Sequence, residues 1–370
     1  SAMKLSKIMS ATVDYRDSDY DMVYFSGRHT MEREFTRLPV RSGVHAIGST
    51  RGTSSHQQNP FLILCERNGG EDFGRCYGYS LIYSGNFIME TERDQFGQVR
   101  VNAGINPQGF TFLIHPGEEF TAPEVVLAFS SQGFTGLTHL YHRIYRENLS
   151  RSPYMKKARP VLINSWEAAY FDFDEEKILN IAREAVGMGV DLFVLDDGWF
   201  RFGNSSRTSM GDWQCNEAKL PGGIAQAASL VHQRGLQFGL WFEPEAVCRS
   251  SELYKQHPDW CLQVPGYEPV EGRHEYLLDL TRQEVRDHLV SVLNSYLDEA
   301  AIDYVKWDMN RPMADGNSLG LEEARKGETA HRYILGLYEI LERVTRAHPH
   351  VLLEGCSSGG ARFDPGMLYY

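Results

Sequence analysis

Several short apolar segments of this sequence end in side chains that can do chemistry. Residues 303–310 form an apolar run that ends in a cation, an indole, a carboxylate and an amide. Buried parallel strands have this composition, and charged groups at their C-terminal ends need a specific reason to be there. Asp308 is therefore the candidate nucleophile. The alternative is that Lys306 and Asp308 are a solvated pair beyond an ordinary strand, because an isolated carboxylate is more often structural than catalytic.

Other predicted strands end in similar clusters. Asp196 and Asp197 follow an apolar run, and because adjacent side chains leave a strand in opposite directions, one is expected to bind a ligand while the other orients the loop. Two adjacent acids at such a point are also typical helix caps. Glu243 and Glu245 follow another run and are the rival carboxylate pair for catalysis.

Carboxylates, indoles and amides without a cofactor signature favour carbohydrate chemistry. An indole face packs on the apolar side of a sugar ring, while carboxylates and amides bind its hydroxyls. Retaining cleavage of a glycosidic bond needs two carboxyl groups about 5 to 5.5 Å apart. Lys306, on the same strand face as Asp308, is expected to hold that carboxylate ionised or to bind a hydroxyl. The indoles equally suit core positions, because Trp is large and usually buried; they are Trp166, Trp199 and Trp241.

Cys356 precedes two serines and two glycines, so the backbone there can approach a ligand closely. The alternative is a buried free thiol before a flexible turn. The chain has six cysteines without a metal-finger spacing, which predicts a reduced cytoplasmic protein, although an even count also permits disulfides. The histidines form no compact ligand pattern. We therefore predict no metal and no cofactor.

Length and charge limit the classes of protein to which this chain can belong. The 370 residues suffice for two ordinary domains or one large barrel with additions. A net charge of -12 argues against nucleic acid or an anionic membrane surface as the main partner. No signal peptide and no apolar run of membrane-spanning length is present, so we expect a soluble chain.

The elements that position these groups fall into two parts. Short alternating segments up to about residue 124, a last strand at 125–129 and a helix at 135–149 predict an antiparallel β-sandwich with a closing helix over 1–150. Residues 151–160, basic and with two prolines, are the predicted linker. Strands and helices then alternate over 161–370, which predicts a parallel sheet with crossover connections.

Almost every strand of this second part ends in residues fit for chemistry, as in a (β/α)8 TIM barrel, whose active site lies at its C-terminal face. A doubly wound sheet is the alternative, but it would show a glycine-rich phosphate loop after its first strand. The barrel looks incomplete, because only five or six strands are found and the role of 276–280 as a barrel strand is open. The predicted fold class is thus α/β, an incomplete TIM barrel preceded by a β-sandwich.

Five of these strand-end motifs together resemble the α-galactosidases of glycoside hydrolase family 36. They are residues 164–168, 195–200, 239–245, 304–310 and 356–360. The resemblance implies that Asp308 is the nucleophile of a retaining hydrolase that acts on α-galactosides such as melibiose and raffinose. It also implies a sandwich domain before the barrel and a homotetramer. The positions that it implies for galactose binding are Trp166, at the rim, and Asp196, Asp197, Trp241, Arg273, Lys306, Cys356 and Gly359.

The resemblance also implies an acid/base aspartate on the next barrel strand, beyond Tyr370. We therefore expect the full-length protein to be active and this polypeptide alone to be inactive. Alternatives within the same chemistry are an α-N-acetylgalactosaminidase and a galactosyl transferase, and the resemblance of Cys356 to a contact for the 2-hydroxyl favours plain galactose. From a different class, a non-catalytic galactoside-binding fragment stays open. Family 31 glucosidases share a similar string around Asp308, but Lys306 and the Asp196–Asp197 pair favour family 36.

Overall fold

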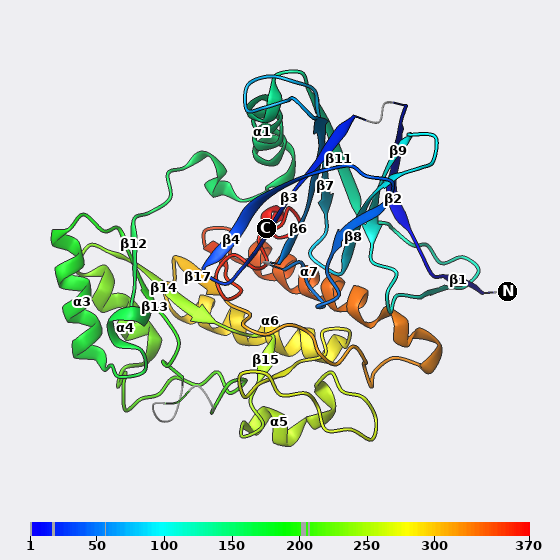
Figure 1. Cartoon of the computed structure of the whole chain (residues 1–370). Helices are drawn as coiled ribbons and strands as arrows, with labels where there is room; N and C mark the ends of the chain where they lie inside the picture. Colours follow the sequence, from blue (N-terminus) through cyan, green and yellow to red (C-terminus); the bar gives the residue numbers. More distant parts are fainter. Residues whose placement is uncertain (1, 17–18, 56, 201–204, 206–207) are drawn as a thin grey trace.

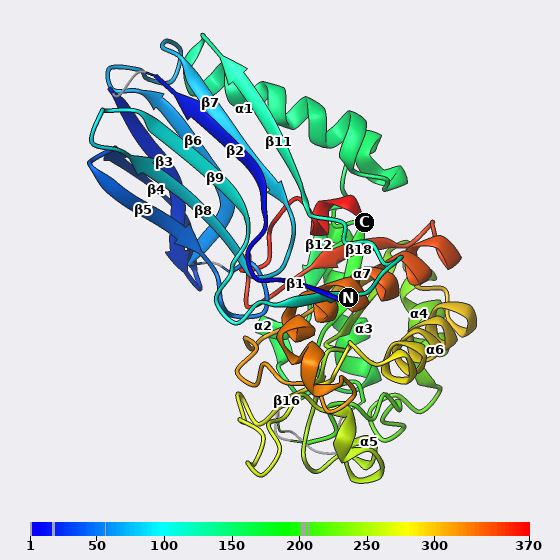
Figure 2. The same ribbon diagram turned by 90° about the vertical axis from the view of Figure 1, so that its right-hand side faces the viewer.

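The computed structural model describes residues 2–16, 19–55, 57–200, 205 and 208–370. Antiparallel strands from the first third of the chain form one part, and a parallel sheet with helices forms the other (Figures 1 and 2). The hydrophobic cluster that includes Leu64 of the first part and Phe238 of the second runs through both. Among the described residues, no helix combines the length and the apolar character that crossing a membrane requires.

Two antiparallel sheets form the predicted β-sandwich. Alternation of side chains creates the inner faces: in β9, the fully buried Val99, Val101 and Ala103 alternate with the more exposed Arg100 and Asn102. The first sheet has the order β11-β7-β6-β3-β4 and the second β2-β9-β8-β5. The strands are β2 (Met9–Tyr15), β3 (Tyr20–Arg28), β4 (Met31–Pro39), β5 (Gly43–Gly48), β6 (Gln58–Glu66), β7 (Cys76–Ile82), β8 (Phe87–Arg93), β9 (Val99–Ile105) and β11 (Glu124–Ser130), with β1 (Met3–Leu5) and β10 (Phe112–Ile114) paired separately.

The helix expected at 135–149 closes the outer face of the first sheet. It is α1 (Gly133–Ile144), which continues into one wider turn, η1 (Tyr145–Leu149). Phe134, Leu137 and Tyr141 of α1 are buried against the sheet because they recur on one helix face. The segment 151–160 contains the short helix η2 (Pro153–Lys156), and its role as a domain linker stays a prediction.

The second part is a parallel half-barrel, as the strand and helix alternation predicted. Its sheet has the order β12-β13-β14-β17-β18, which is also the order along the chain. Such consecutive addition is typical of a barrel, whereas a doubly wound sheet reverses at a switch point. The strands are β12 (Leu162–Asn164), β13 (Leu192–Leu195), β14 (Gln237–Phe242), β17 (Tyr304–Trp307) and β18 (Leu352–Gly355), and the helices between them are α3 (Glu175–Gly187), α4 (Gly223–His232), α6 (Gln283–Glu299) and α7 (Thr329–Ala347).

Local sequence explains where α3 begins. Asp174 caps α3, because its side chain accepts a hydrogen bond of 2.8 Å from the backbone nitrogen of Lys177.

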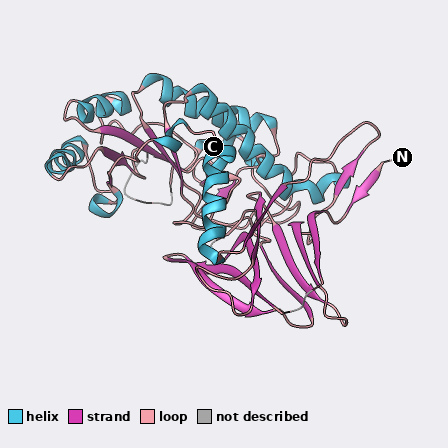
Figure 3. Ribbon diagram, turned by 90° about the horizontal axis from the view of Figure 1, so that it is seen from above, coloured by secondary structure: helices cyan, strands magenta, loops and turns pink. Residues whose placement is uncertain are grey.

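The helices α6 and α7 pack side by side, gold and orange in Figure 1. In the view from above, the strands of the sandwich lie on one side of the molecule and most helices of the second part lie on the other (Figure 3).

The open question about 276–280 is answered by the strand pairing. The strand β16 (Tyr276–Leu277) pairs antiparallel with β15 (Ala246–Val247) outside the barrel sheet, so it is an accessory strand. The remaining short helices are α2 (Trp166–Ala169), α5 (Glu252–Gln256), η3 (Pro258–Trp260), η4 (Glu323–Glu328) and η5 (Met367–Tyr369).

Candidate active site

The C-terminal ends of the barrel strands bring most predicted site residues to one edge of the sheet. Trp241 and Lys306 are paired in register across β14 and β17. Asp196 follows β13, Asp308 follows β17 and Cys356 follows β18. Because parallel strands end at the same edge, these side chains meet although they are far apart in the sequence.

Asp196 is the centre of a buried polar cluster. Its Oδ2 accepts hydrogen bonds from Lys306 Nζ at 2.7 Å and from Asn164 Nδ2 at 2.6 Å. Its backbone nitrogen donates to Ser165 Oγ at 3.0 Å. Burial alone would lower the pKa of Lys306, but the Asp196 carboxylate raises it to about 12. Lys306 is thus a fixed cation, and the Asp196 carboxylate ties together the ends of β12, β13 and β17.

Asp308 is 6% exposed and is held by an indole rather than by Lys306. Trp241 Nε1 donates to Asp308 Oδ2 over 3.2 Å, and the backbone nitrogen of Met309 donates to Oδ1 over 2.9 Å. Lys306 forms its ion pair with Asp196 instead. Lys306 therefore interacts with Asp308 by Coulomb attraction without pairing with it. Trp241 orients the carboxylate by its hydrogen bond.

The rival carboxylates, Glu243 and Glu245, are both buried and engaged. Glu243 Oε1 and Oε2 accept from the backbone nitrogen and the Nδ2 of Asn310, over 2.6 and 2.9 Å. Burial, and then the carboxylates of Glu275 and Asp308, raise the pKa of Glu243 well above its usual value. Glu243 is 1% exposed, so it is enclosed in the protein rather than open to a sugar.

Glu245 is completely buried in a cluster of its own. Its Oε1 accepts from Trp307 Nε1 and from Arg362 Nη1, each over 2.8 Å, and its Oε2 accepts from the Tyr333 hydroxyl over 2.7 Å. These bonds join the ends of β14 and β17 to α7 and to the segment after β18. The position of Glu245 thus indicates a structural role, as the ion-pair partner of Arg362.

The loop after β18 carries the predicted contacts Cys356 and Gly359. Burial, and then the Asp308 carboxylate, raise the pKa of the Cys356 thiol to about 12. The thiol is therefore neutral and suited to a hydrogen bond rather than to nucleophilic attack. Gly359 has a φ of +82°, a left-handed conformation that glycine adopts without strain.

The other predicted residues have mixed positions. Trp166 begins α2 and is half-buried, with its ring edge-on to Tyr170 and Phe171, as suits a rim position. Asp197 is buried beside Asp196. Trp199 is fully buried, and its indole nitrogen donates to the Trp241 carbonyl, so it is a core residue.

Arg273 stands apart from this group. It lies in a tight turn closed by hydrogen bonds between Gly272 and Glu275, with a φ of 54°. Its side chain is exposed, and within the described ranges it makes no hydrogen bond or ion pair with the other predicted site residues. Its assignment to the galactose subsite stays a prediction.

Sequence reasoning missed several supporting residues. Asn164 and Asn310 stand in motifs that were recognised, and their strand-end positions were a usable signal. Arg362 lies just beyond the glycine-rich motif but gave no signal, because a buried arginine is uncommon. Among the described residues, no group of three or more His, Cys, Asp or Glu side chains is arranged to hold a metal ion.

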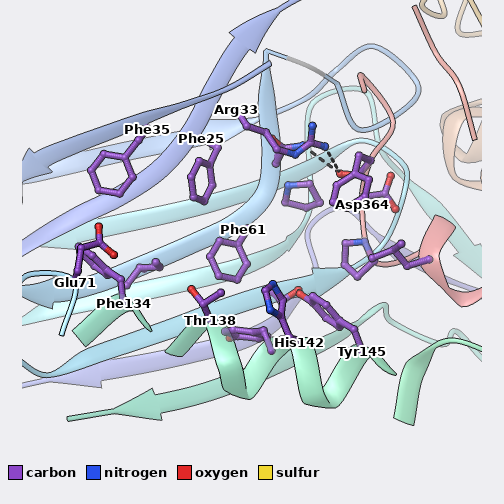
Figure 4. A pocket seen from close by; sticks show the side chains of 18 residues that line it. Phe25, Arg33, Phe35, Phe61, Glu71, Phe134, Thr138, His142, Tyr145 and Asp364 are labelled. Carbon is purple, nitrogen blue, oxygen red and sulfur yellow. Dashed lines mark hydrogen bonds between the residues drawn. The ribbon is translucent and has the colours of Figure 1, made fainter. Parts of the chain in front are cut away.

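An apolar groove of about 350 Å³ lies elsewhere, between the first sandwich sheet and α1. Phe25, Phe35, Phe61 and Phe134 point into it (Figure 4). None of the predicted site residues lines this groove. It is therefore a separate feature from the cluster around Asp308.

Comparisons with known families agree with the geometry. Residues 119–370 match the Melibiase family model, and residues 1–115 match the glycosyl hydrolase family 36 N-terminal domain. The Melibiase match begins at residue 119, which is before the predicted linker at 151–160. The resemblance seen in the strand-end motifs is thereby confirmed.

Relatives and solved structures extend over the whole chain. The chain is 51% identical to α-galactosidase AgaA of Geobacillus stearothermophilus, covering 100% of this chain and 50% of that protein. It is 47% identical to the bifunctional α-galactosidase/sucrose kinase AgaSK of Mediterraneibacter gnavus, covering 99% of this chain and 38% of that protein. The chain thus spans about half, or less, of the length of these relatives.

The crystal structure of AgaA superposes with a TM-score of 0.98 at 51% identity, over 100% of this chain and 51% of that one. A variant of AgaA in complex with raffinose gives a TM-score of 0.98 at 50% identity, over 100% of this chain and 51% of that one. Both matches include the sandwich and the half-barrel. The chain belongs to glycosyl hydrolase family 36, with the Melibiase domain over residues 119–370.

Proposed function

We propose that the full-length protein is a retaining α-galactosidase that removes terminal α-linked galactose from oligosaccharides such as melibiose and raffinose. The observation that carries this proposal is the buried Asp308 carboxylate, oriented by Trp241 beside the Asp196–Lys306 pair. The names of the relatives and the raffinose complex of the AgaA variant support the substrate class.

In the proposed mechanism, an Asp308 oxygen attacks the anomeric carbon while a second carboxyl group protonates the departing oxygen. A galactosyl ester on Asp308 forms, and water activated by that same second group then hydrolyses it with net retention. Trp241 keeps the carboxylate aimed throughout. Asp196 and Lys306, locked to each other, present an acceptor and a donor for sugar hydroxyls.

We assign the proton transfer to a carboxyl group outside residues 1–370. Support comes from the two rival carboxylates inside the chain, because Glu243 is hydrogen-bonded to Asn310 and Glu245 is ion-paired to Arg362. Neither is exposed to substrate. We therefore expect nitrophenol release from 4-nitrophenyl α-D-galactoside by the full-length protein and not by the 370-residue chain alone.

We further propose a cytoplasmic homotetramer. All six cysteines are free, which is the usual state in a reducing compartment. The tetramer rests on the family resemblance, and light scattering coupled to size exclusion would measure it.

The decisive substitution is Asp308→Asn in the full-length protein. It keeps the size and the hydrogen bond from Trp241 but removes the nucleophile, so kcat for 4-nitrophenyl α-D-galactoside should fall by at least about a thousandfold. The matched control is Asp298→Asn, which neutralises an exposed carboxylate on the preceding helix α6. Unchanged hydrolysis by Asp308→Asn would refute the assignment.

A further inference from the structure

A hairpin of the sandwich domain reaches the glycine-rich loop of the barrel. The hairpin joins β3 to β4, and its tip contacts residues 358–363. His29 Nδ1 lies 2.7 Å from the Ser358 carbonyl oxygen. Because a carbonyl oxygen only accepts, Nδ1 must carry the hydrogen. The backbone nitrogen of Gly360 in turn donates to Glu32 Oε1 over 3.3 Å.

Arg33 holds the same segment a few residues further on. Its Nη2 donates to the carbonyl oxygens of Gly360 and Phe363, over 3.3 and 3.2 Å. The guanidinium also lies 4.2 Å from the centre of the Phe363 ring, where a cation–π contact forms. Figure 4 shows Arg33 pointing from the sheet toward the C-terminal segment that carries Asp364.

The backbone at this junction is held in an uncommon conformation on both sides. Thr30 and Arg33 of the hairpin have φ values of 67° and 60°, and Ser358 of the loop has a φ of 49°. Non-glycine residues adopt this region only where their surroundings fix them. A side chain at Gly359 would place its Cβ 2.5 Å from Glu32 Oε1. The surfaces of the hairpin and of the loop are therefore complementary in shape, with no room for a side chain at position 359.

The same loop is connected to the strand that carries the nucleophile. The backbone nitrogen and the Oγ of Ser358 donate to Asn310 Oδ1 over 3.2 and 2.9 Å. Asn310 stands two residues after Asp308 and donates to the buried Glu243. A continuous series of hydrogen bonds thus runs from the sandwich hairpin through the loop to the end of β17.

We propose that His29, Glu32 and Arg33 are positioning residues for the galactoside site. They hold the loop 356–360 in the conformation that presents Cys356 and Gly359 to the sugar. This inference rests on the proposed function and on the prediction that Cys356 and Gly359 contact galactose. The sandwich domain then contributes to substrate binding without touching the substrate.

The test compares kinetic and binding constants of full-length variants. His29→Ala removes the bond to the Ser358 carbonyl, and we expect about a fivefold rise in KM for 4-nitrophenyl α-D-galactoside with kcat within about twofold of the wild type. The Kd for galactose by calorimetry should rise by the same factor. His29→Asn should restore both constants, because its amide can donate from nearly the same position as Nδ1.

Glu34→Gln is the matched control, because Glu34 is an exposed carboxylate on the same hairpin, outside the contacts with the loop. It should leave KM and Kd unchanged. An unchanged KM and Kd in His29→Ala would overturn the inference, and so would a lower melting temperature without a change in either constant. A wild type that binds galactose without hydrolysing it would refute the proposed reaction only, and the ratio of Kd values would then decide this inference. A wild type that does neither would refute both.

Discussion

At the residue scale, the site depends on which buried charge meets which partner. The sequence predicted that Asp196, Trp241, Lys306 and Asp308 would gather at one sheet edge, and they do. It could not predict that Lys306 pairs with Asp196 rather than stabilising Asp308 directly. That choice depends on the order of the strands and on the reach of each side chain across them.

His331 gives a prediction at this scale. It is 4% exposed, its Nδ1 lies 2.9 Å from the Tyr83 hydroxyl, and aromatic rings surround it. Burial lowers its pKa to about 4. The unfolded chain, with a pKa of about 6.5, binds the proton first as pH falls. The stabilisation is therefore complete above about pH 6.5 and is lost as pH falls toward 4.

From this group alone, the free energy of unfolding should be about 2 kcal/mol smaller at pH 5 than at pH 7. Urea unfolding of the wild type and of His331→Asn at both pH values measures it. The substitution removes the titrating ring and keeps a polar partner for Tyr83, so the pH dependence should weaken by that amount. An identical pH dependence in the two proteins would contradict the assignment.

At the scale of elements, the buried cluster around Glu245 fixes the relative positions of strand ends. Glu245→Gln leaves Arg362, which is 3% exposed, without its counter-charge. Breaking a buried pair in this way typically costs about 3–5 kcal/mol of stability. We expect a loss of that size in the free energy of unfolding by urea.

The control for this prediction is Asp14→Asn, which removes one member of the exposed pair between Arg100 and Asp14. Exposed pairs contribute little because water screens them. Equal losses in the two variants would show that the Glu245 cluster is not the support we describe.

The elements themselves were largely predictable. The apolar runs of β13 and β14 and the one-sided pattern of α1 each gave a strand or helix close to its observed place, because the local periodicity matches the burial. The hairpin contact made by His29 was not predictable. Its partner, Ser358, is distant in sequence, and neither residue stands in a pattern that marks the contact.

At the scale of the whole molecule, the two parts are joined by buried polar contacts as well as by a shared core. Asp364 Oδ1 accepts from Ser84 Oγ over 2.6 Å, and Asp364 Oδ2 accepts from the hydroxyl of Ser54. Tyr338 donates to Ser84 Oγ over 2.9 Å. The sequence predicted a sandwich followed by a barrel, but composition and periodicity carry no information about how two such units face each other. Their contact makes the sandwich a support for the loop of the site.

The central claim is that Asp308 of the assembled protein becomes covalently bonded to galactose, and trapping tests it most directly. The full-length protein would be incubated with a 2-deoxy-2-fluoro-α-galactosyl fluoride, and its proteolytic peptides analysed by mass spectrometry. The C2 fluorine slows both formation and breakdown of the ester, but departure of the C1 fluoride keeps formation the faster step. We therefore predict a single 2-deoxy-2-fluorogalactosyl adduct on the carboxylate of Asp308. An adduct on Glu243 or Glu245, or an active enzyme that forms no adduct, would contradict the account.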